Sequence, residues 1–261
     1  MDSHYDYIME RITAHYNKLQ EVGIPNDQIM CIAAYGSMNY NMFKPGVSDV
    51  DTKAIYVPSY EEAVFEKRIS REYHVGNDEH CELKDIREMA NMWRKQNINF
   101  VEILFTPYIL INPLYIDEWR SFAHLRESIA HYDEKKTHLS VGSQAANTLR
   151  QMRNKGYDGK KYANALRLAY FFHCYHLEGF PYWDCINLPE EKAKQLMEIK
   201  YSDDPEVGFS YYDPELLEEN LELYRSLDVP GPRPEVSRLI RSIECRTLKA
   251  GEMWTEMREK V

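Results

Sequence analysis

The chain has 261 residues, 44% of them hydrophobic and 28% charged, which is the composition of a globular protein with a core of ordinary size. Its formal net charge of −10 argues against a surface built to hold long duplex nucleic acid. No apolar run reaches the length of a membrane span, the acidic N-terminus lacks a secretory signal, and the five scattered cysteines contain no Cys-x-x-Cys. We therefore expect a cytoplasmic protein with reduced thiols and no membrane contact.

The first elements expected along the chain are a helix and two strands. Residues 3–21 carry apolar side chains at helical spacing, with Asp2 or Ser3 as the N-cap. Two apolar runs follow, at about residues 28–35 and 51–57, and both are typical of buried strands.

The connection between these two strands holds the most informative residues. The first strand stops at Gly36-Ser37, and the second opens with Asp49-Val50-Asp51. Because residues two apart in a strand share a face, the carboxylates of Asp49 and Asp51 project together. Carboxylates so close repel one another unless cations neutralise them, and a pair of hard divalent ions is the usual solution. Since the Gly-Ser turn offers N–H groups and a hydroxyl to phosphate oxygens, the segment predicts metal-assisted phosphoryl chemistry.

The order of strand, Gly-Ser, short polar segment, Asp-x-Asp and strand resembles the nucleotidyltransferase superfamily typified by DNA polymerase β. The signature of that superfamily is a Gly-Ser followed by Asp-x-Asp or Asp-x-Glu at the opening of the next strand. Each motif alone is common in the loops of unrelated proteins. It is their order in this chain that carries the resemblance.

Residues 79–84 alternate in polarity as a half-buried strand does, and Glu82 falls on the polar face. Asp85 follows, and with Glu88 it forms a start like a capping box for a helix over residues 86–95. Metal-dependent nucleotidyl transfer needs a third carboxylate on a neighbouring strand, both as a metal ligand and as acceptor of the hydroxyl proton. We expect Glu82 to be that carboxylate, against the alternative of a solvated strand charge, and Asp85 to be a helix cap.

The segment after this helix resembles one particular branch of the superfamily. Lys95-x-Asn97, followed by Glu102-Ile103-Leu104-Phe105-Thr106-Pro107, is similar to a pattern in a bacterial and phage branch of the superfamily, often labelled predicted nucleotidyltransferases. Glu102 lies too far past the strand to serve as the third acid. We expect it to form a structural ion pair or a cap.

From about residue 113 the pattern becomes helical. Apolar spacing and capping residues predict helices over about 114–125, 135–154, 160–177, 190–200, 214–226 and 233–258. The expected architecture is therefore α/β (α+β), with a small mixed-sheet domain over residues 1–112 and a helical C-terminal domain over residues 113–261.

Lys160, Asn164 and Arg167 fall within one sector of the expected helix 160–177. The branch has Lys-x-x-x-His-x-x-Arg-Leu at this place, which implies that Lys160 and Arg167 contact the triphosphate, with the guanidinium forked onto phosphate. Without the resemblance, a solvated basic helix face explains these residues about as well. His173 and His176 lack a third ligand nearby, so we expect them to pack in the core.

The resemblance implies a nucleotidyltransferase that moves a nucleoside monophosphate from a nucleoside triphosphate, such as ATP, to an acceptor hydroxyl with release of pyrophosphate. It implies two Mg²⁺ ions, or Mn²⁺ in their place. The acceptor stays open among an RNA or tRNA 3′ end, a small hydroxylated molecule and a protein side chain. The residues expected to hold the metals are Asp49, Asp51 and Glu82, and those expected to bind the nucleotide are Gly36, Ser37, Lys160 and Arg167.

Three positions depart from the branch, which usually has Gly-Ser-Arg-x-Tyr-Gly. This chain has Met38 in place of the Arg, Asn41 in place of the last Gly and Asn164 in place of the helix His. The first change removes a phosphate contact, and the second alters the freedom of the loop. These departures keep a second hypothesis open, that of a catalytically degenerate nucleotide-binding or partner-binding protein that retains the fold.

Overall fold

The computed structural model describes residues 4–76 and 78–259. The chain divides into two compact units, of which the first contains the sheet and the second is helical, as the expected α+β class requires. The first unit is made of Met1–Met38, Lys44–Tyr132 and Arg233–Val261, and the second of Asn39–Phe43 and Asp133–Pro232. Within the described residues, no helix combines the length and apolar character that crossing a membrane requires.

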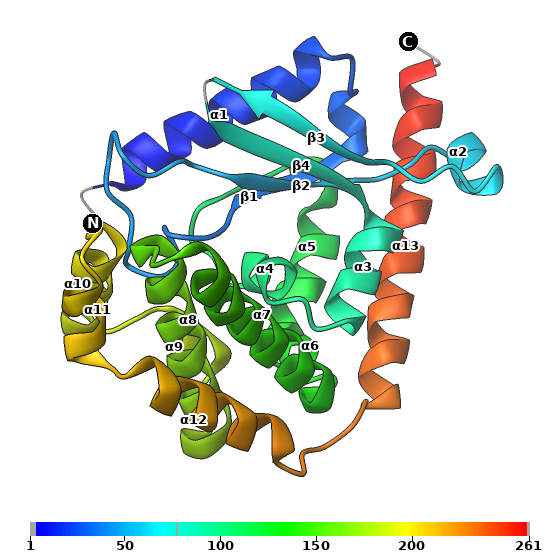
Figure 1. The fold of residues 1–261 in the computed structure, drawn as a ribbon. Coiled ribbons are helices and arrows are strands. Elements are labelled where there is room, and N and C mark those ends of the chain that lie inside the picture. The colour runs from blue at the N-terminus through cyan, green and yellow to red at the C-terminus, as the bar shows by residue number, and fades with distance from the viewer. Residues whose placement is uncertain (1–3, 77, 260–261) are drawn as a thin grey trace. The chain divides into compact units, whose positions relative to one another are not determined.

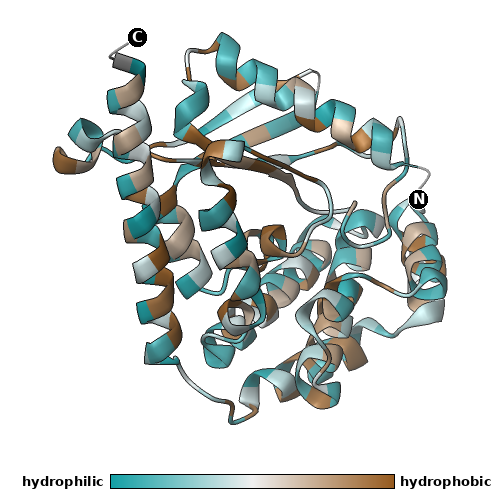
Figure 2. Cartoon of the chain, turned by 180° about the vertical axis from the view of Figure 1, so that it is seen from behind, coloured by the Kyte–Doolittle hydropathy of each residue, from teal (hydrophilic) through white to brown (hydrophobic). Residues whose placement is uncertain are grey.

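The first unit is built on a five-stranded sheet with the order β3-β4-β2-β1-β5. Strands β2 and β4 run parallel, whereas the pairs β1–β2, β1–β5 and β3–β4 are antiparallel. Every residue of β1 and β2 is buried, in agreement with their mostly apolar sequences and with the hydrophobic colour of the central strands in Figure 2. The strands are β1 (Ile29–Ala34), β2 (Thr52–Tyr56), β3 (Ser70–Val75), β4 (Glu79–Asp85) and β5 (Ile109–Ile111).

The register of β2 against β4 decides which side chains share a face of the sheet. Lys53 lies opposite Glu82 in this parallel pair. Since successive side chains of a strand point to opposite faces, Glu82 shares a face with Lys53, while Cys81 and Leu83 of β4 point to the other face and are buried. The alternation predicted for residues 79–84 is confirmed.

Helices cover both faces of this sheet. α1 (Tyr5–Glu21) lies along one face, and α3 (Ile86–Arg94) lies on the other (Figure 1). The N-cap expected at Asp2 or Ser3 lies outside the described residues, and α1 begins after His4. Further helices of this unit are α2 (Tyr60–Val64), α4 (Ile98–Val101), α5 (Ile116–His124), α6 (Arg126–Ala130) and α13 (Pro234–Glu259).

The C-terminal helix α13 belongs to the sheet-bearing unit. It packs so closely on the end of β2 that a Cβ atom added at Gly251 would lie 2.5 Å from Cγ1 of Val57. Its Glu244 pairs with Arg94 of α3 at 3.3 Å. The division of the chain therefore differs from the predicted boundary between residues 112 and 113, because α5, α6 and α13 all belong to the first unit.

The second unit consists of helices and one short segment from the N-terminal half of the chain. The side-chain amides of Asn187 and Asn41 hold that segment, donating to the carbonyl oxygens of Asn39 at 3.0 Å and Leu188 at 2.7 Å. Asn41 has a φ of 57°, a left-handed conformation that asparagine tolerates better than most residues, which accounts for its place in this loop. The helices are α7 (Glu134–Lys155), α8 (Gly159–Phe172), α9 (Tyr182–Ile186), α10 (Glu190–Lys200), α11 (Pro205–Tyr211) and α12 (Pro214–Ser226).

Two features of the second unit were not predicted from the sequence. The helix expected to run to residue 177 is α-helical only to Phe172 and continues as a wider π-helical turn over His173–Glu178. Gly179, in a left-handed conformation, ends that turn. The short helix α11, which follows an N-cap at Asp204, lies between the helices expected over 190–200 and 214–226, in a segment for which no helix was predicted.

Candidate functional site

The Gly36-Ser37 turn directly follows β1 and is held by a buried acid. Gly36 has a φ of +91°, and its N–H donates to Oε1 of Glu102 at 2.6 Å. Since the side chain of Glu102 is buried, its carboxylate fixes the conformation of the turn, in line with the structural role expected for it. The N–H of Gly36 is thus already engaged, whereas the hydroxyl of Ser37 makes a weak contact of 3.7 Å with Sδ of Met38.

Asp49 and Asp51 lie just before β2 and close to this turn. The N–H of Tyr35 donates to the carbonyl oxygen of Asp51 at 3.1 Å, which ties the two segments together. Asp49 is exposed and Asp51 is half-buried, with its Oδ1 accepting from the N–H of His80 at 3.0 Å. Burial raises the pKa of Asp51, and the charge of Asp49 raises it further against the opposing effect of the bond from His80. The charge of Asp49 thus acts on the pKa of Asp51 in the direction that a neighbouring carboxylate produces.

Glu82 carries an ammonium partner on each carboxylate oxygen. Nζ of Lys53 lies 2.5 Å from Oε2, and Nζ of Lys84 lies 2.8 Å from Oε1. Burial by itself would raise the pKa of Glu82, but the hydrogen bonds from both lysines outweigh burial, and the pKa is lowered. Glu82 is thus an ionised carboxylate whose charge is balanced by the two lysines, and it lies on the predicted face of β4.

Lys53 is the site residue that the sequence analysis missed. It is only 2% exposed, and its Nζ lies 4.0 Å from the ring centroid of Tyr35 and 3.9 Å from that of Phe100. Burial lowers the pKa of Lys53, and the ion pair with Glu82 acts in the opposite direction. A signal was available, because a lysine inside an otherwise apolar strand needs a buried partner of opposite charge.

Of the three carboxylates predicted to bind metal ions, two suit a divalent cation and one does not. Asp49 and Asp51 suit such an ion through their charge, their oxygen ligands and their proximity. Glu82 does not suit one in this arrangement, since both of its oxygens already face ammonium groups. Accordingly, residues 4–76 and 78–259 contain no group of three His, Cys, Asp or Glu side chains that could hold a metal ion.

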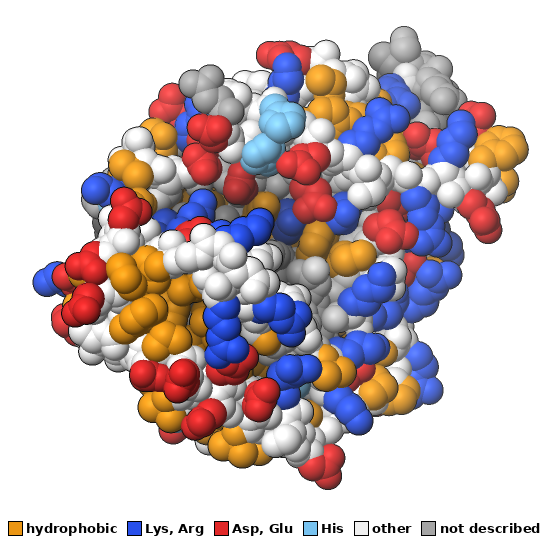
Figure 3. Space-filling model, viewed as in Figure 1, with side chains coloured by type: hydrophobic (Ala, Val, Ile, Leu, Met, Phe, Trp, Pro, Cys, Tyr) orange, Lys and Arg blue, Asp and Glu red, His pale blue; other side chains and the backbone are white. Residues whose placement is uncertain are grey.

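The edge of the sheet next to Asp51 carries further titratable groups. Nδ1 of His80 lies 2.8 Å from Oε1 of Glu72. Buried His15 of α1 contacts Oγ1 of Thr52 at 2.8 Å and Oε2 of Glu79 at 3.1 Å. Figure 3 shows histidine side chains bordered by acidic ones on this part of the surface. His15 thus has a partner on each ring nitrogen, and it links α1 to the sheet.

In the second unit, Lys160 and Arg167 differ in environment although both lie on α8. Lys160 is exposed, as a solvated basic face predicts. Arg167 is 4% exposed, its guanidinium lies 4.0 Å over the ring of Tyr40, and its Nε and Nη2 donate to Oδ1 of Asn164 at 3.3 and 2.9 Å. Within the part of the chain that the structure describes, Nη1 of Arg167 is buried without a hydrogen-bond partner.

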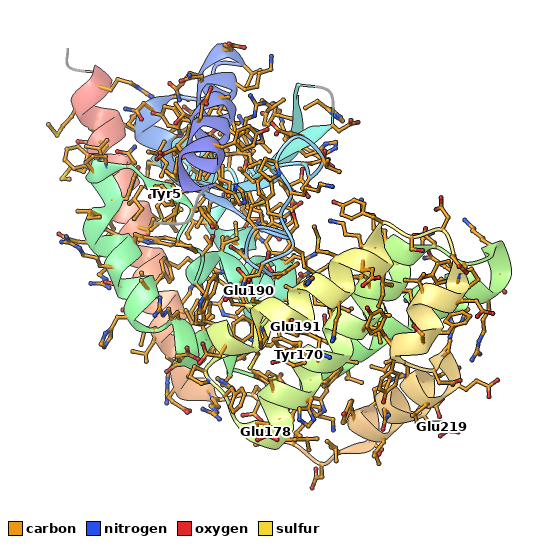
Figure 4. The ribbon with its side chains drawn as sticks, turned by 90° about the vertical axis from the view of Figure 1, so that its left-hand side faces the viewer. Tyr5, Tyr170, Glu178, Glu190, Glu191 and Glu219 are labelled. Atoms are coloured by element: carbon orange, nitrogen blue, oxygen red, sulfur yellow. The ribbon has the colours of Figure 1, made fainter. Side chains whose placement is uncertain are left out.

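A cavity of about 300 Å³ lies within the second unit, between α8, α10 and α12. Its lining is rich in tyrosine, and Figure 4 shows one of these residues, Tyr170, on α8 next to α10, which begins with Glu190 and Glu191. None of the residues predicted to bind the nucleotide is among those that line it.

Comparison of the chain with family models, with curated proteins and with solved structures found no match. The resemblance to the DNA polymerase β-like superfamily therefore rests on the motifs alone. The roles of Asp49, Asp51, Glu82, Gly36, Ser37, Lys160 and Arg167 remain predictions.

Proposed function

We propose that the protein is a metal-dependent nucleotidyltransferase that moves a nucleoside monophosphate from a nucleoside triphosphate to an acceptor hydroxyl. The observation that carries the proposal is the pair Asp49 and Asp51, which interact electrostatically at the opening of β2. A backbone bond from Tyr35 to Asp51 holds this pair beside the Gly36-Ser37 turn. Two carboxylates next to such a turn, one of them half-buried with a raised pKa, support a function that uses their charge.

Each residue has a separate task in this proposal. A Mg²⁺ or Mn²⁺ ion bound by Asp49 and Asp51 would supply positive charge that stabilises the phosphoryl group in the transition state. The N–H of His80 orients the carboxylate of Asp51, and Glu102 keeps the turn in one conformation, so that the hydroxyl of Ser37 can donate to a phosphate oxygen. A contact of Lys160 and Arg167 with the triphosphate is part of the proposal. For Arg167 it is supported by Nη1, which is buried and has no hydrogen-bond partner among residues 4–76 and 78–259.

One observation favours the second candidate function, that of a catalytically degenerate nucleotide-binding or partner-binding protein. Glu82, the residue expected to accept the hydroxyl proton, has both oxygens bonded to lysines and a lowered pKa. A carboxylate whose pKa is lowered is a weaker base. In this candidate the carboxylate pair still binds a nucleotide through a cation, and no transfer follows.

The deciding experiment incubates the full chain and Mg²⁺ with each nucleoside triphosphate, radiolabelled at the α-phosphate, in the presence of RNA, protein extract or small-molecule pools. Labelling of one pool with release of pyrophosphate supports the transferase and identifies the class of acceptor. Both signals should disappear in Asp49→Asn and in Asp51→Asn, and persist in the control Glu72→Gln, an exposed acid of β3. Nucleotide binding without pyrophosphate release from any triphosphate would favour the degenerate protein instead.

A further inference from the structure

Lys53 is a buried charge that the proposed function does not by itself require. Its position on β2, in the middle of the sheet, would accept an apolar side chain, as the neighbouring Ala54 and Ile55 show. Removing an ammonium group from water costs several kcal/mol unless a partner of opposite charge compensates. A lysine kept here at 2% exposure therefore points to a role for its charge.

The surroundings of Lys53 are built from the same segments as the candidate site. Tyr35, one of its two ring contacts, directly precedes Gly36 of the turn, and Phe100, the other, comes from α4. Its ion partner Glu82 lies directly across the parallel pair of strands, with 2.5 Å between Nζ and Oε2. Asp51 comes two residues before Lys53, just ahead of β2. The ammonium is thus held beside Glu82, with the rings of Tyr35 and Phe100 packed against it.

We propose that the ammonium group of Lys53 takes the place of a second divalent ion at Glu82. In this arrangement, which rests on the proposed function, the chain binds one divalent ion, at Asp49 and Asp51, and Glu82 neutralises Lys53. The charges support this. Both oxygens of Glu82 already face ammonium groups, so a second divalent ion at this carboxylate would meet two positive charges at short range.

The test counts Mn²⁺ ions bound to the full chain, measured from the electron paramagnetic resonance signal of free Mn²⁺ in a titration. The wild type should bind one ion in this region. Lys53→Met keeps the length and the apolar stem of the side chain and frees Oε2 of Glu82, so it should bind a second ion. The double variant Lys53→Met/Glu82→Gln should return to one ion. Lys84→Met is the matched control, since it removes the other partner of Glu82 and leaves Lys53 in place, and it should stay at one.

Two outcomes would overturn the proposal. One is a wild type that binds two ions and loses one of them in Glu82→Gln, a comparison that does not depend on whether Lys53→Met folds. The other is a folded Lys53→Met variant that still binds only one ion. Failure of the proposed function gives a different result, because it would show as wild-type Mn²⁺ binding that Asp51→Asn leaves unchanged.

Discussion

The carboxylate of Asp51 is half-buried and accepts a hydrogen bond from the N–H of His80. The neighbouring residue Asp49 has the same charge. The raised pKa of Asp51 means that the folded protein holds this proton more tightly than the unfolded chain does. Below the ordinary pKa of aspartate, about 3.9, both states are protonated and the group has no effect on stability. As pH rises from there through the pKa of Asp51 in the folded state, the free energy of unfolding falls.

Asp51→Asn should remove this pH dependence while keeping an oxygen that accepts the bond from His80. The free energy of unfolding of the variant, minus that of the wild type, should increase as pH rises from about 4 and then level off. Urea unfolding of both proteins in EDTA, at several pH values from 4 to 7, measures the difference. A difference that stays flat or decreases over this range would show that burial does not raise the pKa of Asp51.

Arg167 is buried, although the helical spacing of the sequence places it on the same face as the exposed Lys160. The i, i+4 and i+7 spacing put it beside Lys160, yet its guanidinium is buried over Tyr40, a residue far away in the chain. Helical periodicity could not reveal this, because the covering ring comes from the loop after the Gly-Ser turn. Asn164 does have a local explanation, since its Oδ1 accepts two bonds from Arg167.

Arg167→Lys should weaken nucleotide binding, because an ammonium keeps the charge but loses both the planar fork and much of the stacking on Tyr40. We expect the Kd for a nucleoside triphosphate to rise several-fold, measured by isothermal titration calorimetry. Arg150→Lys, an exposed position on α7, is the control and should leave the Kd unchanged. Equal Kd values for the wild type and Arg167→Lys would remove Arg167 from the predicted nucleotide site.

Among the elements, the join between β4 and α3 was the most predictable from sequence. Alternation up to Lys84 gives way to helical spacing after Asp85, and the structure has β4 ending and α3 beginning there. The cap at Asp85 is confirmed, since its Oδ1 accepts from the N–H of Arg87. Glu88 instead pairs with Arg68, which lies between α2 and β3, a contact that no local capping rule could include.

Asp85 should therefore matter for stability more than for any reaction. Its side chain is fully buried and also bonds the guanidinium of Arg87 through both oxygens. Asp85→Ala should lower the free energy of unfolding by at least the amount that a lost N-cap costs, about 0.5–2 kcal/mol. Asp85→Asn keeps a capping oxygen and should lower it less. Urea unfolding measures both losses. If Asp85→Asn removed nucleotidyl transfer while Glu82→Gln did not, the roles assigned to these two acids would have to be exchanged.

At the scale of the whole molecule, the two compact units do not follow the order of the sequence. The amphipathic pattern of residues 233–258 predicted a helix, and α13 confirms it. The pattern also indicates that the apolar face of this helix packs on another apolar surface. It does not identify that surface, because any apolar surface could cover the same face. The closeness of Gly251 to Val57 depends on the tertiary arrangement and has no local sequence signal.

Gly251→Ala tests this packing. An alanine within a helix normally stabilises it by about 0.5–1 kcal/mol relative to glycine. Here the new Cβ would lie 2.5 Å from Cγ1 of Val57, so we expect a net loss of about 1–3 kcal/mol from overpacking. Thermal and urea unfolding measure it.

The double variant Val57→Ala/Gly251→Ala should be more stable than the sum of the two single changes predicts, since the smaller side chain makes room for the new methyl group. Gly231→Ala is the control, because a Cβ there meets nothing within 4 Å, and it should change stability little. A Gly251→Ala variant more stable than the wild type would contradict the close approach of α13 to β2.

The position of α13 in the chain has a consequence for biosynthesis. A ribosome produces all of residues 133–232 before it produces this helix, so the segment that forms the helical unit is complete while the sheet-bearing unit still lacks its last part. Until then, the apolar surface that Val236, Ile240 and Ile243 later help to bury stays open to water or to a chaperone. The segment that forms the helical unit is therefore complete before the sheet-bearing unit, which contains the candidate site, receives its last helix.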